Sequence, residues 1–219
     1  MTFPAAWRHK SICIAVLYLV PSRKAGSEVP APLKVCEVIP GYTIGGLYAS
    51  RYILPGLEDR SEFGVLTAYT NFNDKKGFYM RRLCARGIGQ AADLADGSFE
   101  WKFERGIWLK VSAQARELAT IRMRPIANLP FNANFPFLCV NDSGVVHLRN
   151  NFASRIGISV SSVHIPKDSP VKEIPFGIKF LSSFWDASNI VIKEPESIPL
   201  RAGINRADNV MGTHMGKSS

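Results

Sequence analysis

The sequence predicts a mainly β (α+β) protein, built as an antiparallel β-barrel or a double-sheet container with few short helices. About ten short segments carry alternating or β-branched residues, and turn-forming residues separate them at short spacing. The composition, with 46% hydrophobic and 21% charged residues, is that of a folded chain, and 219 residues are enough to bury a sizeable core. Such a container has an interior in which a small molecule could sit.

The first part of the chain is predicted to form strands separated by a short helix. Residues 22–28 can form this helix, and Pro30 and Pro32 prevent it from continuing. The paired glycines at 45–46 indicate a bulge or a close approach of backbone or ligand. The strands are predicted at residues 11–20, 33–38 and 42–52.

Residues 62–84 predict a β-hairpin around which the rest of the chain is organised. Turn formers and lysines occupy 71–77, and strand-favouring aromatic residues follow them. Glu62 opens the first strand with apolar residues behind it, so it either marks a wet strand end or lines a cavity. Period-two alternation places Phe63, Val65, Thr67 and Tyr69 on the face of the strand opposite Glu62.

The second half of the chain predicts an antiparallel meander and further strands. Residues 125–138 are rich in proline and asparagine and are predicted to be a crossing segment, and 165–174 can start one helical turn. Residues 1–195 are predicted to form a single domain, and 196–219 a disordered tail. The strands of this half are predicted at residues 99–103, 107–113, 118–124, 145–150 and 153–163, and the segment 180–192 is predicted to end in a strand at 189–192.

The formal charge of +9 indicates an anionic partner. The basic residues are scattered and form no long run, and recognised nucleic-acid motifs are absent from the sequence. The charge therefore favours a small acidic substrate, such as a carboxylate, over nucleic acid.

The cysteines indicate a reducing compartment and no metal site. Cys13, Cys36, Cys84 and Cys139 lie far apart in apolar settings, without a CxxC pair or histidines at ligand spacing. The apolar run at 11–20 is too short to cross a membrane and has no clear cleavage site after it. The expectation is a cytoplasmic protein with no metal, no cofactor and no membrane partner.

Several segments, read in order, resemble the acetoacetate decarboxylase-like superfamily, and most of all its stand-alone members in fungal polyketide and secondary-metabolite pathways. The resemblance covers roughly residues 7–195 and rests on the ordered set rather than on one strong motif. The segments that carry it are VPSRKAGSEVPAPLKVCEV, PGYTIGGLYASRY, SEFGVLTAYTNFNDKKGFYM, ASRIGISVSSVHIPKDSPVKEI and FLSSFWDASNIVI.

This resemblance implies a cofactor-free decarboxylase acting on a β-keto acid, and a polyketide-derived intermediate of toxin biosynthesis as its substrate. In the family a neutral lysine forms a Schiff base that serves as an electron sink. The family's active-site glutamate falls on Glu62, which would position substrate or assist proton transfer. The resemblance also allows a homo-oligomer.

The lysine segment departs from the family pattern. In the family, the lysine follows a proline within a segment of the pattern GRE…PK. The matching region here, CARGIGQAADLADGSFEWKF, has neither the GRE sequence nor the Pro-Lys pair, and the nearest lysine is Lys102. On an alternating strand Lys102 shares a face with Glu100, so both could point inward or outward into water. Lys102 could replace the missing lysine, the chain could bind without Schiff-base chemistry, or the sequence could lack a correctly translated exon.

The remaining site candidates are weaker, and three functions stay open. Arg51 could hold a substrate carboxylate or lie at a rim, whereas His147 and His164 read as structural histidines. The sequence predicts a decarboxylase with Glu62 and Lys102 as catalytic residues and Arg51 as a substrate-binding residue. The alternatives are a non-catalytic binding or accessory protein on the same fold, and a cyclase or hydratase that uses Glu62 as acid or base.

Overall fold

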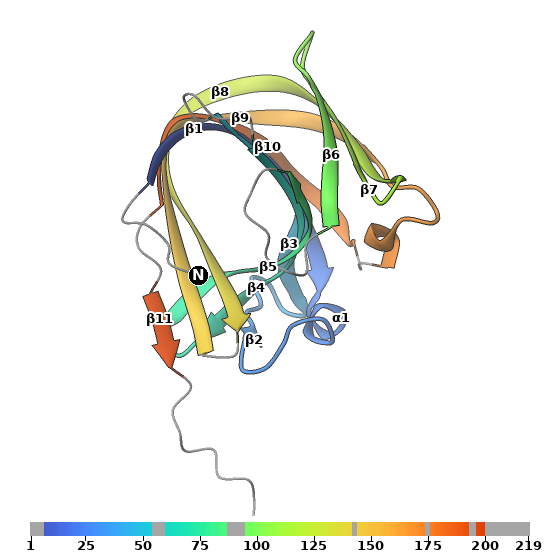
Figure 1. The fold of residues 1–219 in the computed structure, drawn as a ribbon. Helices are drawn as coiled ribbons and strands as arrows, with labels where there is room; N and C mark the ends of the chain where they lie inside the picture. Colours follow the sequence, from blue (N-terminus) through green and yellow to red (C-terminus); the bar gives the residue numbers. More distant parts are fainter. Residues whose placement is uncertain are drawn as a thin grey trace, which may run out of the picture.

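A computed structural model describes residues 7–53, 60–86, 95–141, 144–173, 176–192 and 196–199. Strands dominate these residues, as the sequence predicts, and the helical elements are short (Figure 1). The elements are β1 (Trp7–Pro21), α1 (Ser22–Gly26), β2 (Lys34–Val35), β3 (Tyr42–Ile53), β4 (Arg60–Phe72), β5 (Lys75–Arg86), β6 (Ala95–Lys102), β7 (Ile107–Ala113), β8 (Arg116–Asn141), β9 (Gly144–His164), the 3₁₀ helix η1 (Pro170–Glu173), β10 (Ile178–Ile192) and β11 (Glu196–Pro199).

The strands form one 11-stranded sheet in the order β10-β1-β3-β4-β5-β6-β7-β8-β9-β11, with β2 paired to β4. Most neighbours are antiparallel, and the short β5–β6 and β5–β8 pairings are parallel. The sheet curls strongly, so that β9 also pairs with β10 at the other end of the order (Figure 1). The predicted class of a mainly β protein with few short helices is confirmed.

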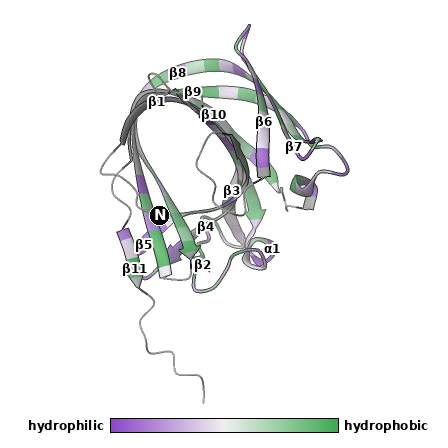
Figure 2. Ribbon diagram, in the orientation of Figure 1, coloured by the Kyte–Doolittle hydropathy of each residue, from purple (hydrophilic) through white to green (hydrophobic). Residues whose placement is uncertain are grey.

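The curled sheet buries both faces of its central strands. On the Phe63 face, β1 and β4 contribute Ile14 and Phe63 to a core that β7 and β8 complete. On the Glu62 face, Cys13 and Leu66 pack with Trp185 of β10. Burial on both faces explains why the sequence of β1 is almost continuously apolar. Along β8, bands of hydrophobic and hydrophilic residues alternate (Figure 2).

The hairpin predicted at 62–84 is formed by β4 and β5. Asn73 occupies the turn with φ +55°, a left-handed conformation that asparagine tolerates. A register shift between Leu66 and Ala68 interrupts the alternation. As a result Tyr69 packs with the Glu62-face cluster, its ring 5.1 Å from that of Phe78, and the prediction that it shares a face with Phe63 is wrong.

The sequence predicts a crossing segment at residues 125–138, but in the structure these residues form the middle of β8. This strand pairs with β9 from Thr120 to Asn141, and a register shift after Pro125 absorbs the first proline. The two strands predicted at 145–150 and 153–163 are likewise one continuous strand, β9. Long-range pairing thus overrides the local proline signal.

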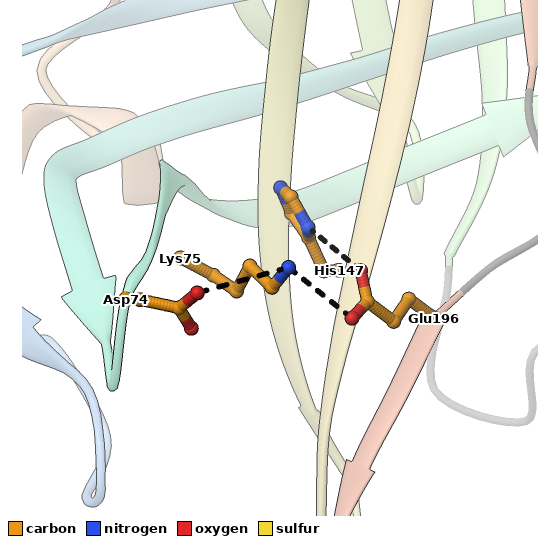
Figure 3. A network of polar contacts seen from close by, with 4 residues as sticks. All are labelled: Asp74, Lys75, His147 and Glu196. Carbon is orange, nitrogen blue, oxygen red and sulfur yellow. Dashed lines mark ion pairs between the residues drawn. The ribbon is translucent and has the colours of Figure 1, made fainter.

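Residues 196–199 were predicted to be part of a disordered tail, and this prediction is wrong because they form β11, which pairs with the start of β9. Glu196 extends the contact through its carboxylate (Figure 3). Its oxygens lie 3.3 Å from Lys75 Nζ and 3.6 Å from His147 Nδ1, and Lys75 Nζ is also 4.0 Å from the Asp74 carboxylate. The network joins β11 to β9 and to the tip of the β4–β5 hairpin. The rest of the predicted tail lies outside the described residues.

The remaining predictions for the first part of the chain are largely confirmed. The short helix forms as α1, whereas the strand predicted at 33–38 is reduced to β2. A side chain at Gly46 would meet the backbone oxygen of Val16 at 2.1 Å, so the glycine pair marks a close approach of two strands. Within the described residues, no helix combines the length and apolarity that a membrane crossing requires.

Candidate functional site

Glu62 lies near the start of β4 with only 4% of its surface exposed, so it is not a wet strand end. It sits opposite Ser50 of β3 in the antiparallel register. Its Oε1 accepts a hydrogen bond of 3.4 Å from Ser50 Oγ and a short one from the hydroxyl of Tyr52. Because Ser50 and Tyr52 are two residues apart on one strand, both hydroxyls reach the same carboxylate.

A second pair of polar groups lies on the same face, on β1 and β3. The hydroxyl of Tyr48 donates a hydrogen bond of 3.6 Å to Cys13 Sγ, and Ser11 Oγ lies 3.2 Å from the same sulfur. Cys13 is directly opposite Ser50, the residue that contacts Glu62. Ser11, Cys13, Tyr48, Ser50, Tyr52 and Glu62 are together called the Glu62 cluster.

Burial keeps the tyrosine and cysteine members of the Glu62 cluster protonated. Desolvation by burial raises the pKa of Tyr52 well above its usual value, and the negative charge of Glu62 adds to the effect. The pKa of Tyr48 rises for the same first reason, and that of Cys13 reaches about 11. The cluster therefore sets neutral O–H and S–H groups around one carboxyl group, an arrangement suited to hydrogen bonding and proton transfer.

An aromatic wall adjoins the Glu62 cluster. The ring of Tyr48 lies 6.4 Å from that of Phe135 and 5.8 Å from that of Phe137. Trp185 of β10 contacts Phe135, with the ring centroids 5.0 Å apart. These rings give the polar groups a low-dielectric surrounding, in which electrostatic interactions are stronger than in water.

Lys102, the predicted catalytic lysine, lies at the end of β6 with 58% of its side chain exposed. Its Nζ is 2.8 Å from the Glu100 carboxylate and 4.6 Å from the centre of the Trp108 ring. Of the two orientations left open by the sequence, the structure shows the outward one. The contacts of Lys102 are with Glu100 and Trp108 and not with the Glu62 cluster.

Arg51 lies between Ser50 and Tyr52 on β3 and therefore points to the opposite face of the sheet from Glu62. Its Cζ lies 5.9 Å from the centre of the Phe103 ring. The structure thus does not bring the three predicted site residues, Glu62, Lys102 and Arg51, together. Their individual roles stay predictions.

Sequence reasoning missed Ser50, Tyr52 and Cys13 as neighbours of Glu62. A signal for the first two exists, since Tyr48, Ser50 and Tyr52 recur at period two in one strand. That pattern places them on one face, but which residues of β4 lie opposite them depends on the register of β3 with β4.

The described ranges contain no buried lysine. Lys75 and Lys110 are partly buried, and both pair with carboxylates, those of Glu196 and Glu117. His147, read as structural, is buried with its Nδ1 beside Glu196. In the same ranges, no three side chains among histidine, cysteine, aspartate and glutamate gather closely enough to hold a metal ion.

No family model matches the sequence, and no curated protein matches it either. Solved structures are similar over 90% of the chain. One is the enduracididine biosynthesis enzyme MppR complexed with pyruvate, with 12% identity, a TM-score of 0.61 and 91% of that chain covered. An acetoacetate decarboxylase has 13% identity, a TM-score of 0.57 and 91% coverage. An acetoacetate decarboxylase-like enzyme from Sphingomonas wittichii RW1 has 8% identity, a TM-score of 0.61 and 94% coverage. In its fold, the chain is therefore similar to acetoacetate decarboxylase and enzymes like it.

Proposed function

We propose that the chain is a carbon–carbon lyase that decarboxylates a small β-keto acid at the Glu62 cluster. The observation that carries this proposal is the buried Glu62 carboxyl group, held by the hydroxyls of Ser50 and Tyr52. The fold shared with acetoacetate decarboxylase supports it by analogy. The excess of positive charge favours an anionic substrate, and a polyketide-derived keto acid of secondary metabolism is the proposed natural one.

The proposed reaction needs groups that stabilise an enolate and then protonate carbon. When the bond between the α-carbon and the carboxylate breaks, its electron pair moves to the ketone oxygen and carbon dioxide leaves. The neutral hydroxyl of Tyr48 is a suitable donor to the developing negative charge when it turns from Cys13 Sγ to the substrate, whereas the hydroxyl of Tyr52 keeps its bond to Glu62. A proton passed through the Tyr52–Glu62 pair to the α-carbon gives the ketone, and a proton from water restores the pair. The net reaction consumes one proton and releases one carbon dioxide.

The proposed route forms no imine, unlike the Schiff-base chemistry that the family resemblance implies. A lysine becomes nucleophilic when it is desolvated or lies beside another cation. Lys102 is exposed and paired with Glu100, which is the opposite environment. Among the described residues, no lysine lies in a desolvated environment.

The test measures release of carbon dioxide from 3-oxobutanoate and 3-oxohexanoate. Glu62→Gln is expected to lower kcat by about 10²-fold or more, whereas Glu100→Gln, an exposed carboxylate outside the cluster, retains activity. If the Glu62→Gln variant released carbon dioxide at the unaltered rate, the Glu62 cluster would not take part in the reaction.

Borohydride trapping with the same acids separates the two routes. The imine-free route predicts an unchanged intact mass. An adduct mapped to Lys102 would restore the lysine mechanism and overturn the imine-free route, while keeping the decarboxylase.

A second candidate function is a non-catalytic binding protein. The absence of a buried lysine from the described ranges favours it. Keto-acid binding that depends on Glu62, without release of carbon dioxide, would make this function the better account.

A further inference from the structure

The turn that joins β2 to β3, residues 37–42, carries apolar side chains at the surface and is called the apolar turn. Val38, Ile39 and Tyr42 are 41%, 48% and 36% exposed, and Pro40 is exposed between them. Single exposed apolar side chains are common on protein surfaces, whereas neighbouring ones that form a patch indicate a contact site. The apolar turn is therefore a candidate contact site.

Hydrogen bonds hold the backbone of the apolar turn in a fixed shape. The Val38 N–H donates to the Tyr42 carbonyl at 2.9 Å, and the Tyr42 N–H donates to the Ile39 carbonyl at 3.0 Å. Gly41 has φ +79°, which glycine adopts without strain, and its N–H donates to the Glu37 carboxylate at 3.0 Å. Because the turn is ordered before any contact, binding through it does not have to offset the entropy of ordering a loop.

Basic residues border the apolar turn. The backbone N–H of Ser22, the first residue of α1, donates to the Gly41 carbonyl at 2.9 Å. This contact sets the next two residues of α1, Arg23 and Lys24, beside the turn. Lys34 lies on β2, which precedes the turn and packs beside α1 (Figure 1). All three basic side chains are exposed, and none forms an ion pair within the described part of the chain.

The charge around the apolar turn is positive. Residues 22–42 hold two carboxylates, those of Glu28 and Glu37. Glu28 lies 3.6 Å from a guanidinium nitrogen of Arg81, which offsets its charge, and Glu37 accepts the hydrogen bond from Gly41. The three basic side chains therefore give the region an excess of positive charge next to an exposed apolar tip.

An anionic lipid surface matches both properties of this region. At the boundary between head groups and acyl chains, apolar side chains leave water while neighbouring basic side chains meet anionic head groups. Tyrosine, which the turn carries at Tyr42, is enriched at this boundary. A second copy of the chain would bring the same positive charge to the contact, and a nucleic acid has no apolar layer for the turn. The sequence-based expectation of no membrane partner concerns a spanning segment, which a contact at the membrane surface does not need.

We propose that the apolar turn, together with Arg23, Lys24 and Lys34, binds the surface of membranes that contain anionic lipids. The turn inserts its apolar side chains among the head groups, and the basic side chains hold the chain to the negative surface. Tyr42 begins β3, whereas Ser50 of the Glu62 cluster lies near the other end of that strand. The membrane site is thus separate from the Glu62 cluster and does not depend on the proposed decarboxylation.

Cosedimentation of the full chain with vesicles tests the proposal. The probes are vesicles of equal parts phosphatidylserine and phosphatidylcholine, and vesicles of phosphatidylcholine alone. The chain is expected to partition onto the anionic vesicles at least about tenfold more strongly, because each basic residue near the surface contributes about fivefold. High salt is expected to reduce this difference, since it screens the attraction.

The apolar part of the site is tested by Val38→Ser/Ile39→Ser. This double variant is expected to bind the anionic vesicles at least about tenfold more weakly, because the turn loses its aliphatic side chains. Its matched control is Val160→Ser/Ile178→Ser, which changes exposed side chains of the same types on β9 and β10 and is expected to bind like the unaltered chain.

The basic part of the site is tested by Arg23→Ala/Lys24→Ala. This double variant is expected to lose at least about tenfold of its partition onto the anionic vesicles. Its matched control, Arg116→Ala/Arg122→Ala, removes the same charge from exposed arginines of β8 and is expected to lose less.

Equal partition onto the two kinds of vesicle would overturn the proposal, and so would unchanged binding by Val38→Ser/Ile39→Ser. Equal losses in the two basic double variants would also overturn it, because overall charge alone would then explain the binding. All the altered side chains are exposed, so the variants are expected to unfold in urea like the unaltered chain, and a loss of binding then reports on the contact itself.

Discussion

The hydroxyl of Tyr52 on β3 donates a hydrogen bond to the buried carboxyl group of Glu62 on β4. The two residues are diagonal neighbours across an antiparallel pair in which Ser50 faces Glu62 directly. This contact places a proton donor and a carboxyl group within one buried cluster. The proposed chemistry and the first prediction both depend on it.

Tyr52→Phe is expected to destabilise the fold by about 1–3 kcal/mol, because a buried oxygen of Glu62 loses a donor. In a double-mutant cycle with Glu62→Gln, the coupling free energy from urea unfolding is expected to be about 0.5–3 kcal/mol. Tyr42→Phe, at an exposed tyrosine, serves as the control. Additive effects of the two substitutions would show that the contact does not stabilise the folded chain.

Gly46→Ala is expected to destabilise the protein by about 3 kcal/mol or more, since the new Cβ would lie 2.1 Å from the Val16 oxygen in the adjacent strand. Thermal or urea unfolding measures the effect. At Gly26, where the nearest side chain is 3.9 Å away, the same change is expected to be nearly neutral. Similar stability of the two variants would argue against the close packing of β1 and β3.

Glu196→Gln is expected to weaken the attachment of β11 in a pH-dependent way. The hydrogen bond from Lys75 lowers the pKa of Glu196, with the Lys75 charge and His147 adding to the effect. A lowered pKa stabilises the folded state above the unfolded pKa of about 4.3, and this contribution disappears as the pH falls through the folded pKa.

Urea unfolding of both proteins at pH 7 and at pH 3 checks this prediction. The difference in stability is expected to be present at pH 7 and to shrink at pH 3. Glu104→Gln, at an exposed carboxylate without an ion pair among the described residues, is expected to show no such change between the two conditions. A constant difference at both pH values would show that the carboxylate charge is not involved.

Cys13 is expected to resist alkylation in the native protein. Its burial raises the thiol pKa to about 11, and Cys84 reaches about 12, so both carry little thiolate at pH 8. Partly exposed Cys36 is expected to react first with iodoacetamide, as read by peptide mapping. Guanidinium-unfolded protein, in which all cysteines are accessible, provides the control. Equal rates at Cys13 and Cys36 in the native state would show that the Cys13 thiol is as accessible to the reagent as that of Cys36.

The sequence by itself determined the strand content, the β4–β5 hairpin and the position of Glu62 near the start of a strand. These features are local, because period-two alternation and turn residues act within a few positions along the chain. The same alternation grouped Tyr48, Ser50 and Tyr52 on one face of β3. It did not determine which strand lies opposite them.

Only the tertiary structure decided the register that sets Ser50 and Tyr52 against Glu62 and the direction in which Lys102 points. It also decided the shift that moves Tyr69 to the Glu62 face, and the continuation of β8 through its prolines. The physical reason is that a strand's register is fixed by contacts with strands distant in sequence, and a shift of one residue moves every later side chain to the other face.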